Sequence, residues 1–201
     1  MISRASNPGM NSYRHLAALS AAVLAATVIA APAAGAAARP SCPLPSKAEV
    51  KRAMSSDVDR PARKSTAIKG VRVEALPRGF AYGQVSVSRH DGLTEYGYQW
   101  SDDRDDVDRK HRSLWVRVVC KPGLRGLNAL KKAPLQLGTL SGDDVRPAKI
   151  DGRRVLTKKG DGALGHGRYV GWVEREGVAV TVMASEPLVP DLSGIVAGIR
   201  L

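Results

Sequence analysis

The fold class is decided by the stretch RYVGWVEREGVAVTVMA, residues 168–184. Its two apolar halves, 168–175 and 178–184, flank the pair Glu176-Gly177. From Val178 onward every second residue is apolar, so these side chains share one face of an extended chain. Two apolar segments on either side of an acidic residue followed by glycine predict a β-hairpin.

The same pattern occurs twice upstream, and short helical segments lie between the strands. Hairpins are predicted around Asp91-Gly92 and over residues 145–159, and a strand over 112–120. Helices are predicted over 46–56, where Ser46 and Glu49 form a capping box, over 124–132, and from Asp191 onward. This order predicts an α+β fold. An antiparallel β-sheet of hairpins should carry short N-terminal and C-terminal helices packed on one face.

Two segments of the chain resemble each other. Residues 68–73 (IKGVRV) are similar to residues 150–155 (IDGRRV), and each is followed by a hairpin with an acidic-Gly turn. Duplicated αβββ halves would explain this, and so would chance similarity between two β-rich segments.

The first 38 residues have the features of a secretory signal peptide. Basic residues precede a run over 16–31 whose only polar members are Ser20 and Thr27, and alanines at 36–38 offer a cleavage pattern. A retained membrane anchor over residues 16–38 is the alternative, and Met10 is an alternative start to Met1. Removal of 1–38 takes away two arginines and no acidic residue. It leaves one mature domain, 39–201, made of an N-terminal helix and linker (39–67) and an α+β domain (68–201).

Export places the two cysteines, Cys42 and Cys120, in an oxidising compartment where a disulfide persists. A bond between them would tie the mature N-terminus to a central strand. The alternative is two free, buried thiols.

The last 50 residues carry one resemblance. The features are Ile150-Asp151-Gly152, the strand Tyr169–Val173, the Glu176-Gly177 turn, the strand Val178–Ala184 and an apolar terminal helix. This ending resembles those of extracytoplasmic sensor domains of bacterial anti-sigma factors and of small PsbP-like secreted proteins. The resemblance implies a curved antiparallel sheet with packed helices and a role in binding a ligand or protein. It covers about a quarter of the chain and transfers no functional residue.

The sequence contains no recognisable catalytic constellation. There is no nucleophile elbow, P-loop, dinucleotide fingerprint or zinc-protease motif. We therefore predict no enzyme activity, no catalytic residue, no metal and no cofactor. His90, His111 and His166 are interpreted as surface or turn residues. The acidic run 102–108 lacks the glycine and glutamate positions of a calcium loop and is interpreted as a solvated connection.

The net charge of +12 indicates an anionic partner. Basic residues concentrate in three segments: 47–72 with eight, 121–132 with four and 146–160 with six. Export argues against nucleic acid, and membrane contact is expected only through an uncleaved signal segment. An anionic cell-envelope polymer or another extracellular protein is the expected partner.

The candidate binding surface consists of three aromatic and four basic residues. The aromatic stripe is either a stacking platform or core. The residues are Tyr96, Tyr98, Trp100, Arg153, Arg154, Lys158 and Lys159.

The function expected is a secreted, non-enzymatic binding or sensing protein of the bacterial envelope or exterior. One alternative is an extracellular enzyme inhibitor that uses the segment 101–111 or 160–167. The other is a secreted hydrolase that uses one of the three histidines.

Overall fold

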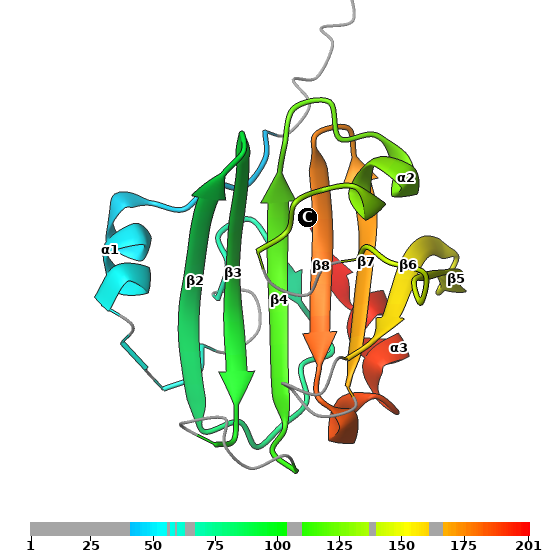
Figure 1. The fold of residues 1–201 in the computed structure, drawn as a ribbon. Coiled ribbons are helices and arrows are strands. Elements are labelled where there is room, and N and C mark those ends of the chain that lie inside the picture. The colour runs from blue at the N-terminus through cyan, green and yellow to red at the C-terminus, as the bar shows by residue number, and fades with distance from the viewer. Residues whose placement is uncertain are drawn as a thin grey trace, which may run out of the picture. The chain divides into compact units, whose positions relative to one another are not determined.

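A computed structural model shows a seven-stranded antiparallel sheet with strand order β2-β3-β4-β8-β7-β6-β5 (Figure 1). The structure describes residues 41–55, 57–58, 60–62, 67–103, 110–136, 140–160 and 167–201. The strands are β2 (Tyr82–His90), β3 (Leu93–Ser101), β4 (Ser113–Cys120), β5 (Arg146–Ile150), β6 (Arg153–Lys159), β7 (Arg168–Arg175) and β8 (Val178–Ala184). The predicted α+β class with an antiparallel sheet is confirmed.

Short helices and a second, two-stranded sheet flank the large sheet. The helices are α1 (Lys47–Ser55), α2 (Gly126–Lys131), the 3-10 helix η2 (Glu186–Leu188) and α3 (Leu192–Ala197). The small sheet pairs β1 (Arg72–Val73) with β9 (Ile199–Arg200). Among the described residues, no helix is both long and apolar enough to cross a bilayer. Residues 1–38, and with them the predicted signal peptide, lie outside the described residues.

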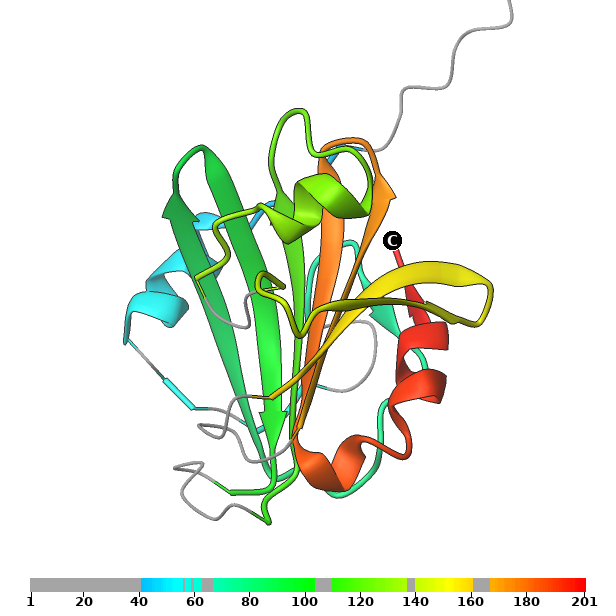
Figure 2. The same cartoon turned by 45° about the vertical axis from the view of Figure 1, so that its right-hand side comes forward.

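The first face of the large sheet carries the main core. Its alternate residues, including Tyr96, Val118 and Val180, pack with Ile195 and Val196 of α3, and Ala53 of α1 packs against the same cluster. The N-terminal and C-terminal helices therefore lie on one face, as the sequence predicts. Figure 2 shows α3 standing on the side of the sheet away from α2.

The second face is also buried, which the alternation of apolar and polar residues did not indicate. Leu130 of α2 packs there with Leu93, Val119 and Leu140. Two glycines make room for this covering layer. A Cβ at Gly97 would lie 2.2 Å from Arg117 Cγ, and one at Gly171 would lie 2.2 Å from Leu140 Cδ1. This face carries buried polar residues as well, because most strands place their polar residues on it.

The turns and the first helix form where their residues predict. Asp91 and Gly92 have φ of 47° and 70°, and Asp151 and Gly152 have φ of 47° and 75°. Two successive positive φ angles produce the turn whose twist matches a hairpin. At the start of α1, the Glu49 N–H donates to Ser46 Oγ at 3.3 Å and the Ser46 N–H donates to Glu49 Oε2 at 2.7 Å. This reciprocal pair is the predicted capping box.

The disulfide between Cys42 and Cys120 is present, with the two Cα atoms 5.9 Å apart. It joins the chain just before α1 to the end of β4. The prediction of this bond is confirmed, and the alternative of two free thiols is wrong.

The two halves of the large sheet match in their strands and differ in their helices. The triplets β2-β3-β4 and β6-β7-β8 meet at the antiparallel pair β4–β8. However, α1 packs on the first face and α2 on the second. Two halves related by the twofold axis that joins antiparallel neighbours would place both helices on the same face. The two segments whose sequences resemble each other also lie in different surroundings. In 68–73, β1 pairs with β9 in the small sheet, whereas 150–155 spans the β5–β6 turn of the large sheet.

Candidate functional site

The aromatic stripe on β3 belongs to the core. Tyr96 and Trp100 are 0% exposed and Tyr98 is 2% exposed. The interpretation of these three residues as an exposed stacking platform is therefore wrong, because β3 is a central strand whose first face is covered. These residues instead form a core stripe, which was the alternative interpretation from the sequence.

The polar ends of these aromatic side chains hold the N-terminal segment against the sheet. The Ala62 N–H donates to Tyr98 Oη at 2.9 Å, and Trp100 Nε1 donates to the Ala62 carbonyl at 2.8 Å. Tyr96 Oη donates to the Glu49 carboxylate. Burial and the hydrogen bond to Glu49 raise the pKa of Tyr96 far above its usual value. The tyrosine therefore stays protonated and acts as a fixed donor.

A buried ion pair lies on the second face. Arg117 Nη1 donates to Glu95 Oε2 at 2.9 Å, and their side chains are 3% and 2% exposed. The Gln136 N–H donates to Glu95 Oε1 at 2.7 Å, and Arg117 Nη2 donates to Met183 Sδ at 3.0 Å. Burial lowers the pKa of the Arg117 guanidinium, and the Glu95 carboxylate opposes that shift. The pair fixes the segment after α2 to the sheet.

His90 links β2 to the segment after α2. His90 Nδ1 lies 3.1 Å from Ser88 Oγ, while its Nε2 lies 2.5 Å from the Pro134 carbonyl oxygen and 3.8 Å from Glu95 Oε1. The ring thus ties the Pro134 backbone to β2. His111 is buried, and His166 lies outside the described residues.

Most of the segments 101–111 and 160–167, which were considered for an inhibitory or calcium-binding role, lies outside the described residues. The structure does not describe residues 104–109 and 161–166. At the described edge of the acidic run, Asp102 accepts from Arg112 Nε at 2.8 Å. Among the described residues, no three His, Cys, Asp or Glu side chains gather in a way that would hold a metal ion.

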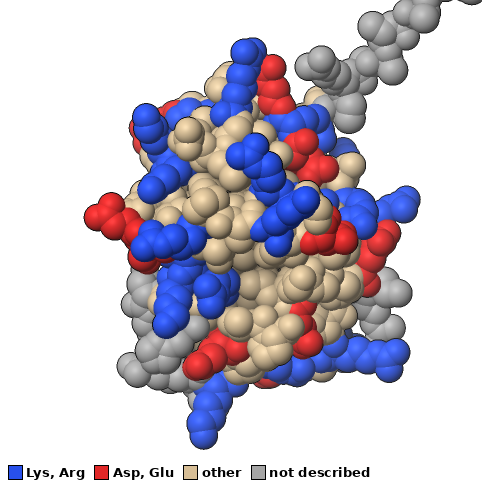
Figure 3. Space-filling model, turned by 90° about the vertical axis from the view of Figure 1, so that its right-hand side faces the viewer, with Lys and Arg blue, Asp and Glu red and all other residues tan. Residues whose placement is uncertain are grey.

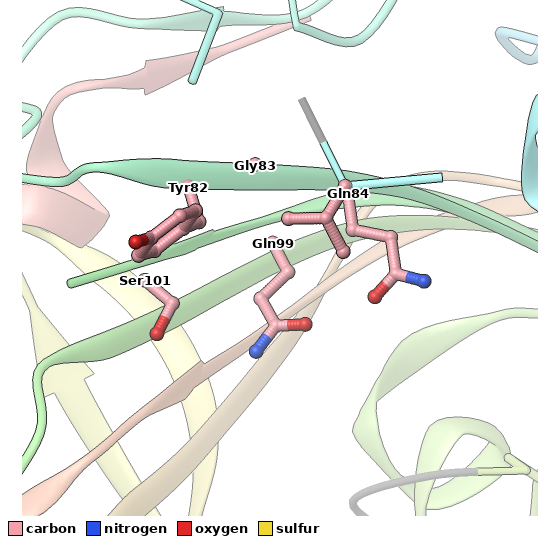
Figure 4. Close-up of a pocket in the computed structure, with 6 residues that line it drawn as sticks. Tyr82, Gly83, Gln84, Gln99 and Ser101 are labelled. Carbon is pink, nitrogen blue, oxygen red and sulfur yellow. The ribbon is translucent and has the colours of Figure 1, made fainter. Parts of the chain in front are cut away.

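A hollow at the edge of the sheet is lined by polar residues (Figure 4). Tyr82 and Gln84 of β2 and Gln99 and Ser101 of β3 surround it, with Val58 beside them. Its volume of about 20 Å³ suits a single water molecule. It is too small to serve as a site for an organic ligand.

A larger groove lies between α2 and the strands β6 and β7, and we call it the basic groove. It is lined by Arg125, Gly126, Leu127, Asn128, Arg154 and Val173, and its volume is about 420 Å³. Arg125 pairs with Glu176 through its Nε at 2.7 Å, whereas Arg154 is exposed and makes no ion pair with a described residue. Figure 3 shows this side of the molecule, where Lys and Arg side chains are scattered over the surface and are more widespread than the Asp and Glu side chains between them.

The fold gives different surroundings to the four basic residues that the sequence singled out. Arg154 and Lys159 are exposed. Lys158 lies 3.7 Å from Asp144 Oδ1. Arg153 turns inward, where it donates to the Val196 carbonyl at 2.6 Å and lies 4.6 Å from the Trp172 ring centroid. The prediction for Arg153 as a surface contact is therefore wrong, because its charge fixes the end of α3 to the sheet.

The sequence prediction did not name two other residues of this basic surface, Arg125 and Lys149. Lys149 stands directly opposite Arg154 in the β5–β6 pairing, and both are exposed. The signal in the sequence was the basic excess of 121–132 and 146–160. What the sequence did not reveal is that α2 packs against β6 and β7, which brings these two segments together.

A second cleft, which we call the Phe80 cleft, lies on the other side of the sheet. It is lined by residues 60–62, residues 76–81 and Trp100, and its volume is about 650 Å³. Leu76 and Phe80 supply apolar surface, and Arg60 and Arg78 are exposed at it. In the sequence, residues 60–62 and 76–81 carry no motif that indicates a cleft.

Comparison with known families, curated proteins and solved structures found none that matches this chain. The fold and the clefts therefore define the class of protein by themselves: a disulfide-bonded antiparallel α+β domain with a basic groove.

Proposed function

We propose that this chain is a secreted, non-enzymatic protein that binds an anionic polymer of the bacterial cell envelope through the basic groove. The observation that carries the proposal is the meeting of two basic segments in the fold. Residues 121–160 hold ten basic and three acidic residues. Because α2 packs against β6 and β7, one basic residue from each segment, Arg125 and Arg154, lines the same groove. Clustered positive charge on one side of a protein attracts polyanions and speeds their association.

The β5–β6 hairpin adds support because its charges are unfavourable without a partner. Lys149 and Arg154 are cross-strand neighbours on the same face. Like charges placed directly opposite in a sheet destabilise the pairing. An anionic ligand between them would remove this repulsion, which makes the hairpin a suitable contact for phosphate or carboxylate groups.

The proposed location outside the cell rests on two features. The first is the signal-like N-terminus, and the second is the disulfide, which is compatible with an oxidising compartment. The proposed sensing role and the resemblance to extracytoplasmic sensor domains fit a protein that binds at the envelope.

The absence of catalysis is part of the proposal. None of the three clefts described above is lined by a histidine, cysteine or acidic residue among the described part of the chain. The groove offers Arg154 and the Asn128 amide as anion-binding groups, beside Arg125, which is paired with Glu176. None of these side chains transfers protons at neutral pH.

The experiment is a titration of the protein with poly(glycerol phosphate), a phosphate polymer, and with dextran as the uncharged polymer. The wild type should bind the first and not the second, with an affinity that falls as salt rises, because the Debye length is about 8 Å at 0.15 M. The variant Lys149→Glu/Arg154→Glu should bind at least about tenfold more weakly, since two attractive charges become repulsive.

The matched control is Lys47→Glu/Arg89→Glu, which makes the same change in net charge on α1 and β2, away from the groove. It should lose much less affinity than the groove variant. Equal losses in the two variants would show that net charge alone drives binding and would refute the groove as the site.

A further inference from the structure

The Phe80 cleft is built to a fixed shape. Its first wall, residues 60–62, is held by the hydrogen bonds of Ala62 to Tyr98 and Trp100. Its second wall, residues 76–81, is held by the Ala81 N–H, which donates to the Ser101 carbonyl at 2.9 Å. Ligand sites in proteins are usually preformed in this way, and a volume of about 650 Å³ lies in their ordinary range.

Arg112 fixes the second wall further and is itself neutralised. Its Nη1 donates to the Arg78 carbonyl at 3.0 Å, and its guanidinium carbon lies 5.6 Å from the Phe80 ring centroid. Its Nε donates to Asp102 Oδ2 at 2.8 Å, so that its charge is already paired. Arg112 thus orients Phe80 and the Arg78 backbone without contributing free charge.

The two other arginines at the cleft have no such partner among the described residues. Arg60 comes from the first wall and Arg78 from the second, and both are exposed. Within the described residues neither forms an ion pair, and no Asp or Glu lines the cleft. The lining between them is mainly apolar: Leu76 and Phe80 are half-buried, and Trp100 at the same cleft is fully buried.

We propose that the Phe80 cleft binds a small amphiphilic anion, with its apolar body on Leu76 and Phe80 and its acidic head between Arg60 and Arg78. Charge complementarity selects this occupant. Two exposed guanidinium groups, at a cleft that no described acidic residue lines, favour a carboxylate or phosphate, which arginine binds with paired hydrogen bonds. The apolar lining favours a chain or ring over water. This small-molecule site is distinct from the polymer-binding groove and goes beyond the function proposed above.

The test uses three probes that share a decyl-length chain, each kept below micelle formation. Decanoate carries a carboxylate, decyl phosphate carries a phosphate, and decyl glucoside carries no charge. Calorimetric titration of the oxidised protein should show saturable one-to-one binding of at least one of the two anions. The ratio of their affinities identifies the preferred head group. Decyl glucoside should bind at least about tenfold more weakly, because it leaves both arginines without a partner.

Variants separate this site from the rest of the surface. Arg60→Ala/Arg78→Ala should weaken anion binding at least about tenfold with little change in thermal stability, since both side chains are exposed. Leu76→Asp supplies a second variant, which should weaken binding by placing a like charge beside the head group. Lys149→Glu/Arg154→Glu in the basic groove should leave decanoate affinity unchanged. The failure of one proposal is thus distinguishable from the failure of the other.

Three outcomes would overturn the inference. The first is no saturable binding of either anion. The second is decyl glucoside binding as tightly as the anions, which would mean apolar contact alone. The third is an affinity that Arg60→Ala/Arg78→Ala leaves unchanged.

Discussion

Removal of the disulfide should destabilise the folded protein by several kcal/mol. Cys42 and Cys120 lie 78 positions apart and therefore close a loop of about 79 residues in the unfolded chain. The loop-closure relation for such a loop gives about 4.5 kcal/mol at 25 °C. A small domain has a net stability of about 5–15 kcal/mol, so this bond supplies a large share of it.

The folded state should nevertheless persist without the bond, because other contacts hold the same segment. Glu49 bonds with Tyr96, and Ala62 bonds with Tyr98 and Trp100. These contacts act in the folded state, whereas the disulfide acts mainly by restricting the unfolded chain. We therefore expect a native circular dichroism spectrum in the absence of denaturant and a much earlier transition in urea.

The assay is urea unfolding followed by tryptophan fluorescence and far-UV circular dichroism. It compares the oxidised wild type, the wild type in reductant and the Cys42→Ala/Cys120→Ala variant. The last two should agree, which separates loss of the cross-link from the effect of the substitutions. If the reduced wild type and the double variant each lost less than about 1 kcal/mol of unfolding free energy, the reasoning would be refuted. Such a result would mean that the bond does not restrict the unfolded chain to a significant extent.

Two further predictions concern buried and half-buried carboxylates. Glu95→Gln should lower the free energy of unfolding by about 3 kcal/mol because it leaves the Arg117 charge buried without its partner. The double variant Glu95→Leu/Arg117→Met should lower it by less than the single change. A larger loss in the double variant on thermal unfolding would contradict this account. Burial by itself would raise the pKa of Glu49, but hydrogen bonds from Tyr96 and Ser46 outweigh it and hold the pKa below its usual 4.5. Ionised Glu49 therefore stabilises the fold above about pH 4.5, and this contribution is lost as the pH falls through the lower folded pKa. Glu49→Gln should be less stable than wild type at pH 7 and equal to it in strong acid, and a pH-independent difference in urea midpoint would be inconsistent with this.

The sequence predicted the local features of the fold well because they depend on neighbouring residues. The Asp91-Gly92 and Asp151-Gly152 turns and the Ser46–Glu49 capping box each need only a few adjacent side chains. The Cys42–Cys120 bond was predictable for another reason, since only one pairing exists for two cysteines.

The features that the sequence did not predict depend on which segments meet. Tyr96, Tyr98 and Trp100 fall on one side of a strand whether that side is core or surface, and only the packing of α1 and α3 decides. Glu95 and Arg117 look like ordinary surface residues because each is charged, and their burial follows from the segment after α2 crossing the second face.

The candidate sites, too, were predictable only where they do not depend on which segments meet. The basic excess of 121–132 and 146–160 is visible in the sequence, and of the four basic residues it singled out, Arg154 and Lys159 are exposed. The inward turn of Arg153 depends on the carbonyl groups of Val196 and Ile199, more than 40 residues away. The Phe80 cleft arises from two loops that meet over Trp100, and neither loop has a distinctive sequence.

The most direct test of the central claim is a map of backbone amide shifts during titration of the oxidised protein with poly(glycerol phosphate). Binding at the basic groove predicts saturable changes concentrated in Arg125–Lys131 and in the β5–β6 hairpin, which disappear in high salt. Changes centred on α1, or small changes spread evenly over all exposed lysines and arginines, would contradict it.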